Sequence, residues 1–124
     1  MKIIIRFTTY EVRAELLDTP TAQAIYEVLP LQENVNRWGD EIYFSIPVHS
    51  RLESSAKAEV NEGDLAYWPT MPAFCIFFGP TPVSQGNRPC AASPVNVFGK
   101  LSSLDREKLK KIENGEKVTL ERAH

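Results

Sequence analysis

The 124-residue chain is predicted to fold as one mainly β domain, an antiparallel barrel or sandwich with two short helices. Two observations predict this class. Apolar and polar residues alternate in about eight short segments, as they do in strands that bury one face and expose the other. Only two segments place apolar residues at helical spacing. The length suits a single domain and no internal repeat is visible, so residues 1–124 are expected to form one unit.

The N-terminal region shows the change from strand to helix most clearly. Residues 3–7 and 12–16 alternate apolar with polar side chains around a polar stretch, which predicts a hairpin. Thr19 then suits a helix N-cap and Pro20 suits the first helical turn. Apolar residues at helical spacing continue to Leu29, where a proline ends the run.

The central region returns to strand-like alternation, with Gly39-Asp40 as a tight turn. Residues 49–61 are polar and charged and are expected to form an exposed connection. The segment Phe74–Phe78 has too many large apolar residues for either face to be exposed to solvent. Both faces must therefore be covered by protein, or one of them must contact a ligand. The strands predicted here are residues 33–38, 41–46, 65–68 and 74–78.

Residues 79–94 form the longest irregular segment and are rich in Pro, Gly, Ser and Asn. Loops of this length inside compact domains are often functional. After this loop we expect a strand over 95–101, a helix capped by Ser102 or Ser103 that stops at Asn114-Gly115, and a closing strand over 117–122.

Charge and hydropathy exclude several partner classes. A net charge of −2 and a pI near 5.7 argue against nucleic acid and give no reason to expect a membrane surface. The longest apolar run, residues 71–78, is interrupted by Pro72 and is too short to span a bilayer. The N-terminus meets a charge at Arg6 and lacks a small-residue cleavage site, so a cytoplasmic protein is expected.

The cysteines and histidines predict no metal or cofactor. Cys75 and Cys90 are expected to be free thiols, because nothing marks a secreted protein; the alternative is one disulfide between them. His49 and His124 lie far in sequence from both cysteines and from each other, without the spacing of metal ligands.

Strand alternation predicts a cluster on one outer face. It places Glu41 and Tyr43 opposite the core side of their strand, and Trp68 and Phe77 on the outward side of theirs. One carboxylate beside three aromatic rings would form an apolar pocket with one ionisable group, a reasonable site for a small molecule or short peptide. The alternative is that the rings pack beneath the 79–94 loop and that Glu41 is solvated.

Three weaker candidates are Asn36, Trp38 and Asn96, of which the two asparagines complete the candidate ligand-binding set. A buried asparagine more often ties a loop to the backbone than binds a ligand, so a structural role is favoured for both.

Several motifs resemble one known family. Asn96–Leu101, before a helix and a closing strand, resembles the C-terminal part of cyclophilins, and Phe74–Gly79 resembles their aromatic strand. The whole chain resembles compact cyclophilin-like proteins of bacteria and archaea whose function is not established. The motifs shared with this compact group are residues 36–44, 63–69, 77–82 and 92–97.

The resemblance implies a closed, antiparallel, eight-stranded barrel with two short helices capping its ends. True cyclophilins are peptidyl-prolyl isomerases that combine an arginine with an apolar proline pocket. The corresponding strand here, Glu41–Pro47, has no arginine, and of the pocket only Phe77 matches. We therefore expect a binding protein for a small molecule or short peptide. The alternatives are an isomerase with a different donor, Arg37 or Arg88, and an interaction subunit that forms a homo-oligomer.

Overall fold

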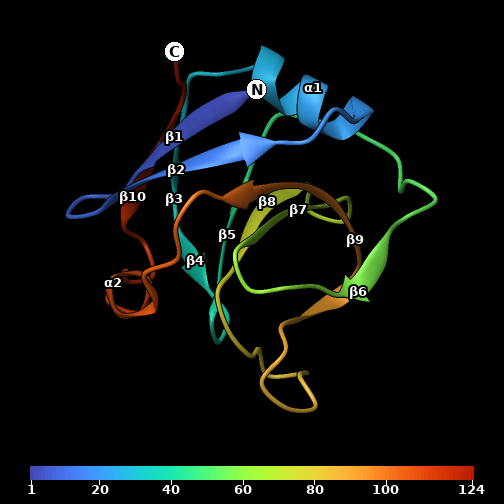
Figure 1. Cartoon of the computed structure of the whole chain (residues 1–124), viewed down its shortest axis with the longest axis vertical. Helices are drawn as coiled ribbons and strands as arrows, with labels where there is room; N and C mark the ends of the chain where they lie inside the picture. Colours follow the sequence, from blue (N-terminus) through green and yellow to red (C-terminus); the bar gives the residue numbers. More distant parts are fainter.

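The computed structural model describes all residues, 1–124, as ten strands and two helices. Nine strands form one antiparallel path in the order β3-β10-β1-β2-β9-β7-β8-β5-β4, and β6 pairs with β9 beside it. The sheet curls around the main core (Figure 1). In chain order the elements are β1 (Lys2–Arg6), β2 (Glu11–Leu16), α1 (Pro20–Glu27), β3 (Leu31–Asn34), β4 (Asn36–Arg37), β5 (Glu41–Ser45), β6 (Lys57–Glu59), β7 (Asp64–Trp68), β8 (Ala73–Phe77), β9 (Cys90–Leu101), α2 (Arg106–Lys110) and β10 (Lys117–Arg122).

The antiparallel, mainly β class is confirmed, but a closed barrel of eight strands is not. The hydrogen-bonded path ends at β3 and β4, which are consecutive pieces of one segment. β3 pairs with β10, whereas β4 pairs with β5 on the other side. Between them, Val35 bonds instead to the turn before β10, through the carbonyl of Glu116 at 2.8 Å and the N–H of Gly115 at 2.6 Å. The two edges are therefore joined by the chain and not by a continuous ladder.

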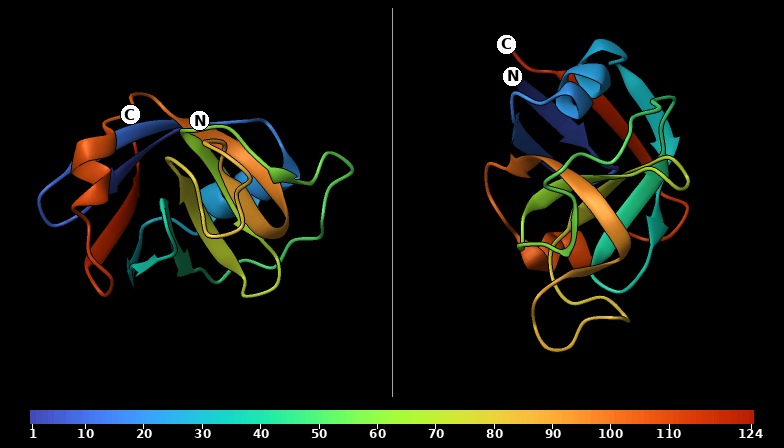
Figure 2. Two further views of the ribbon diagram at one scale, coloured as in Figure 1. Left: turned by 90° about the horizontal axis from the view of Figure 1, so that it is seen from below. Right: turned by 90° about the vertical axis from the view of Figure 1, so that its right-hand side faces the viewer.

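The region around β9 also differs from the prediction. The expected exposed connection 49–61 contains the short strand β6, and β9 begins at Cys90, inside the expected loop 79–94. β9 pairs with β6 near its beginning and with β7 and β2 further along. The remaining irregular segment extends from the body between β8 and β9 (Figure 2).

Helix α1 begins as predicted. The Thr19 hydroxyl accepts the N–H of Ala22 at 3.1 Å, and Pro20 occupies the first turn. The helix buries Thr21, Ala22 and Ile25 toward the main core.

Helix α2 begins later than predicted. Its N-cap is Asp105, whose carboxylate accepts the N–H of Lys108 at 3.2 Å, so the predicted cap at Ser102 or Ser103 is wrong. The reason is that the N–H of Ser102 still donates to the carbonyl of Arg13 at 2.8 Å, which continues the β9–β2 pairing. Neither helix has the length and apolar character needed to cross a membrane.

Two hydrophobic cores lie on opposite faces of the sheet. The main core lies inside the curl, where Phe74 stacks on Phe44 at 5.0 Å between ring centroids and meets Phe98 edge-on at 5.1 Å. The second, smaller cluster includes Cys75 and Phe77 from the opposite face of the same strand. Both faces of β8 thus belong to a hydrophobic cluster, which is one of the two alternatives that its composition left open.

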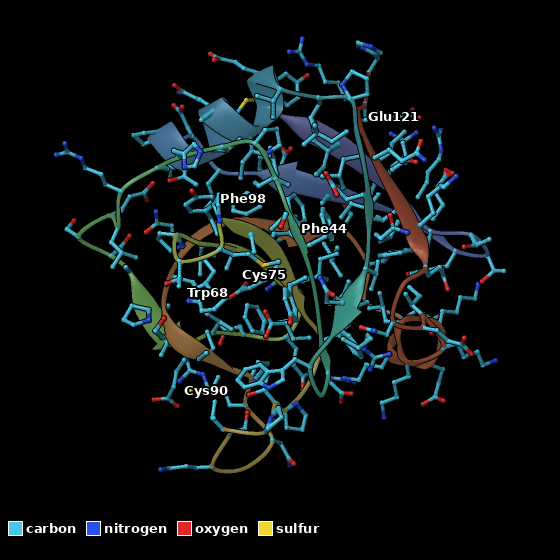
Figure 3. All side chains as sticks on the ribbon, turned by 180° about the vertical axis from the view of Figure 1, so that it is seen from behind. Phe44, Trp68, Cys75, Cys90, Phe98 and Glu121 are labelled. Carbon is cyan, nitrogen blue, oxygen red and sulfur yellow. The ribbon has the colours of Figure 1, made fainter.

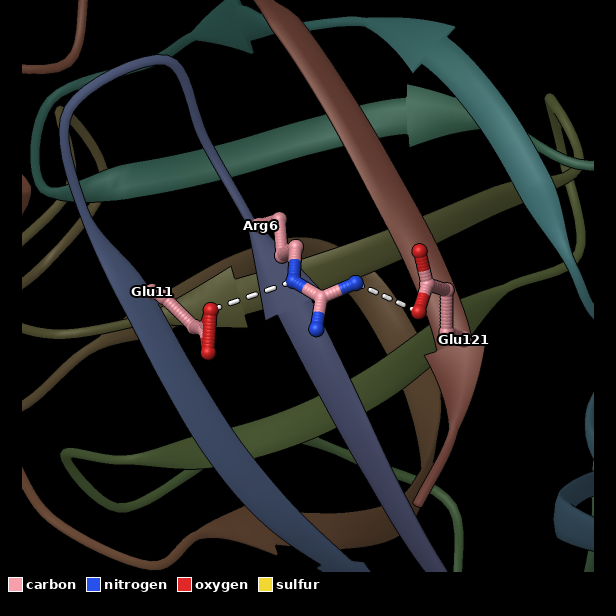
Figure 4. A network of polar contacts seen from close by, with 3 residues as sticks. All are labelled: Arg6, Glu11 and Glu121. Atoms are coloured by element: carbon pink, nitrogen blue, oxygen red, sulfur yellow. Dashed lines mark hydrogen bonds and ion pairs between the residues drawn. The ribbon is translucent and has the colours of Figure 1, made fainter.

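A surface network joins β1 to its two neighbouring strands, β2 and β10. Arg6 of β1 donates to Glu11 of β2 at 3.1 Å and to Glu121 of β10 at 2.5 Å (Figure 4). These hydrogen bonds raise the pKa of Arg6 above its ordinary value. The side chains are partly exposed, and ion pairs of this kind add little to stability.

Candidate functional site

A pocket of about 270 Å³ opens on the outer face of the sheet. Its walls come from the β4–β5 turn, from β5, β7 and β8, and from the first half of β9. This volume is just below the usual range for small-molecule sites, roughly 300–1,000 Å³. The lining residues are Trp38, Glu41, Tyr43, Trp68, Cys75, Ala91, Ala92 and Val95.

The floor of the pocket belongs to the second hydrophobic cluster. Cys75, Ala91 and Val95 are members of both, and Tyr43 and Trp68 pack against the cluster while keeping part of their surface exposed. The rings are therefore supported from behind by close-packed side chains, and the pocket is a built feature of the outer face.

A two-residue turn positions two of the lining side chains. The backbone N–H of Trp38 donates to the carbonyl of Glu41 at 3.0 Å, and the backbone N–H of Glu41 donates to the carbonyl of Trp38 at 3.1 Å. Gly39 has φ +60, which a glycine at the first central position of a hairpin turn adopts readily. A Cβ on Gly39 would come within 2.9 Å of Pro82, so the turn lies tightly against the loop that follows β8. This packing holds Trp38 at the rim and Glu41 at the start of β5.

Glu41 is the acid of the pocket and is only 6% exposed. Burial disfavours the charged form and raises its pKa to about 7, although a hydrogen bond with the Cys75 thiol acts in the opposite direction. Burial, with the nearby Glu41 charge, also raises the pKa of the Cys75 thiol well above its ordinary value. None of the ion pairs in the structure includes Glu41, so its negative charge has no counter-ion.

The Trp68 ring is fixed by a partner on β9. Its indole N–H donates to the Ser93 hydroxyl at 2.7 Å, which ties the end of β7 to the first half of β9. Trp68 and Cys75, which both line the pocket, are labelled next to each other in Figure 3. Trp68 therefore offers a ligand its ring surface, because its donor is already used.

The structure brings together three of the predicted site residues, Glu41, Tyr43 and Trp68. Phe77 faces the same side but is fully buried in the second cluster, so it supports the pocket without lining it. Glu41 is not solvated, which was the alternative to a buried acid.

The two predicted asparagines do not line the pocket. Asn36 donates weakly, at 3.4 Å, to the carbonyl of Tyr43. Asn96 is fully buried, accepts the N–H of Glu53 at 2.8 Å, and donates to Thr21 at 3.1 Å and to the carbonyl of Arg51 at 2.8 Å. It ties the segment before β6 to α1 and β9, the structural role that a buried asparagine usually has.

The sequence pattern did not predict the β9 wall of the pocket, and it indicated Trp38 only as a weaker candidate. Ala91, Ala92 and Val95 carry no chemical signal, and their place depends on a strand start that the composition did not indicate. The signal for Trp38 was its position beside the Gly39-Asp40 turn, which returns the chain directly to Glu41.

The arginines considered as isomerase donors have other partners. Arg37 donates to the carbonyls of Ile112 at 2.7 Å and Gly39 at 2.9 Å, and Arg88 donates to the carbonyl of Val60 at 3.1 Å. Neither arginine lines the pocket. No group of three His, Cys, Asp or Glu side chains is placed to hold a metal ion.

Comparison with known proteins agrees with this architecture. The family model described as Cyclophilin-like matches residues 1–121. The chain belongs to the cyclophilin-like family. This cyclophilin-like chain is also similar to a solved solution structure, a hypothetical protein from Archaeoglobus fulgidus, with 44% sequence identity and a TM-score of 0.82. The match covers 99% of this chain and 95% of the archaeal one. No curated protein matches.

Proposed function

We propose that this cyclophilin-like protein binds a small molecule in the outer pocket. The observation that carries the proposal is a preformed, mostly apolar pocket that contains a single buried carboxyl group. Small-molecule sites combine apolar and aromatic walls with a few placed polar groups in this way. A short peptide would place one side chain in the pocket, since about 270 Å³ leaves no room for a longer segment.

Intrinsic fluorescence provides a direct assay. The chain has two tryptophans, and both line the pocket, so any ligand that enters it changes their surroundings. We expect fragments that bind in a ligand-observed NMR screen to change the tryptophan emission as well.

A blocking variant tests the location of binding. Ala92 is an exposed residue at the rim, so Ala92→Phe is expected to fill the pocket entrance without disturbing the core. The matched control is Ser55→Phe, which adds a ring at an exposed position that does not line the pocket. Ligands should be lost from the first variant and kept by the second. Equal binding to both variants, or no binding fragment for the unmodified protein, would refute the proposal.

An isomerase activity is the second function to be tested. Isomerisation of an X-Pro bond must overcome a barrier of roughly 18–20 kcal/mol, and cyclophilins use an arginine beside the proline for this. Because Arg37 and Arg88 have other partners, we expect a protease-coupled assay on proline tetrapeptides to give only the uncatalysed rate. A rate that rises in proportion to protein concentration would instead support a divergent isomerase.

A further inference from the structure

We propose that the outer pocket selects an organic cation, a small amine or quaternary ammonium group, held against the rings of Trp38, Tyr43 and Trp68 with Glu41 as its counter-ion. This inference rests on the proposed function and narrows the class of ligand.

The charge of the pocket favours a cation. Glu41 is the only acidic or basic amino acid among the lining residues. The other titratable groups that face it are the thiol of Cys75 on β8 and the phenol of Tyr43 on its own strand. β7 and β9 contribute only Trp68, alanines and a valine. A buried carboxylate without a counter-ion is costly, and a bound cation would supply the missing charge, whereas an anion would be repelled.

Nearby charges outside the pocket do not supply that counter-ion. Arg37 lies 3.8 Å from Asp40 in the adjacent turn and stacks over Phe78, a residue of the main core. Arg88 and Glu59 pair at 3.8 Å beside a neighbouring polar depression. The only formal charge that can meet a ligand inside the pocket is therefore that of Glu41.

The rings favour the same class of ligand. Three aromatic side chains come from separate segments: the β4–β5 turn, β5 and β7. The face of an aromatic ring attracts a cation, tryptophan most strongly, and the attraction is greatest at desolvated sites. The indole N–H of Trp68 already donates to Ser93, which leaves its π face for the ligand. Several rings with one carboxylate form the kind of cage that holds alkylammonium groups.

A pair of probes of the same shape separates charge from size. Choline carries a trimethylammonium group, and 3,3-dimethylbutan-1-ol replaces its nitrogen with carbon and is neutral. We expect choline to quench or shift the tryptophan emission and to bind at least about tenfold more tightly than the neutral alcohol at about pH 8. The charge of choline does not titrate, so any pH dependence of its binding comes from the protein.

The pH dependence has a defined direction. Choline should bind the ionised form of Glu41, whose pKa is about 7 in the empty pocket. About a tenth of Glu41 is ionised near pH 6 and most of it near pH 8, so choline affinity should rise about tenfold over this interval. A neutral ligand that accepts a hydrogen bond from protonated Glu41 would show the opposite trend.

Two variants complete the test. Glu41→Gln keeps the shape of the side chain and should weaken choline binding about tenfold or more, with the neutral alcohol little affected. Glu59→Gln removes a 68% exposed carboxylate outside the pocket and should leave choline binding unchanged. Circular dichroism verifies that both variants are folded.

The outcomes distinguish the inference from the proposed function. If both probes bind equally well to the unmodified protein and Ala92→Phe removes both, the pocket binds ligands but the cation inference is overturned. If choline does not bind while neutral fragments do, the inference is likewise overturned. If choline and every fragment fail to bind, the proposed function fails as well.

Discussion

Replacement of Glu41 by glutamine should remove a specific pH dependence from the stability of the protein. The carboxyl has a pKa of about 7 in the folded state and 4.5 as its ordinary value, so the folded protein holds this proton more tightly than the unfolded chain does. Protonation therefore stabilises the fold. The contribution of Glu41 is most favourable at low pH and is lost as the pH rises from about 4.5 through about 7.

The size of this change in stability follows from the two pKa values of Glu41. Their difference, at about 1.36 kcal/mol for each pH unit, gives a loss of about 3 kcal/mol in the free energy of unfolding. Glu41 is nearly fully buried, so solvent screening reduces this figure little. Glu41→Gln cannot ionise, and its stability relative to the unmodified protein should rise by about 3 kcal/mol between about pH 4 and about pH 8.

Urea denaturation of both proteins at a series of pH values measures this difference. Every other ionisable group is common to the two proteins, so subtraction isolates Glu41. A difference that stays constant within about 0.5 kcal/mol, or that falls as the pH rises, would refute a buried carboxyl with a raised pKa.

Three further outcomes follow from the structure. Asn96→Ala should lower the free energy of unfolding by about 2–4 kcal/mol in urea denaturation, because a fully buried side chain loses three hydrogen bonds; a loss below about 0.5 kcal/mol would contradict its structural role. Gly39→Ala should cost about 1–2 kcal/mol and change the Trp38 emission, because the turn needs a positive φ and has no room for a methyl group; unchanged stability and emission would argue against the turn geometry. With a thiol reagent at neutral pH, the half-buried Cys90 should react and the buried Cys75 should not until urea is added; two equally fast thiols in the native protein would contradict the burial of Cys75.

The sequence predicted those elements that are marked by alternation or by capping residues within the element itself. The β1–β2 hairpin and β10 follow from alternation, and α1 follows from the Thr19 cap with the proline after it. β6 was missed because it has only three residues, and two of them are charged. The early start of β9 was not predicted, because Ala91, Ser93 and Pro94 have a loop-like composition. The pairing of this part of β9 with β6 is long-range and leaves no local signal in the sequence.

Strand alternation predicted one part of the candidate site, the side chains that share the outer face of β5 and β7. Period two placed Glu41, Tyr43 and Trp68 on one face, and the structure brings them into one pocket. The same rule placed Phe77 on that face, but it cannot distinguish a residue that lines a cavity from one buried beneath it. The opposite wall, formed by small residues of β9, depends on tertiary packing and could not be predicted from local pattern.

The most direct measurement is an NMR titration of the Glu41 side-chain carboxyl in glutamate-labelled protein, assigned with Glu41→Gln, without and with saturating choline. We expect a midpoint at about pH 7 in the empty protein. With choline bound, the midpoint should fall by about one pH unit or more, because a cation beside the carboxylate favours its charged form. A midpoint near 4.5 that choline does not change would contradict both the buried acid and the cation site.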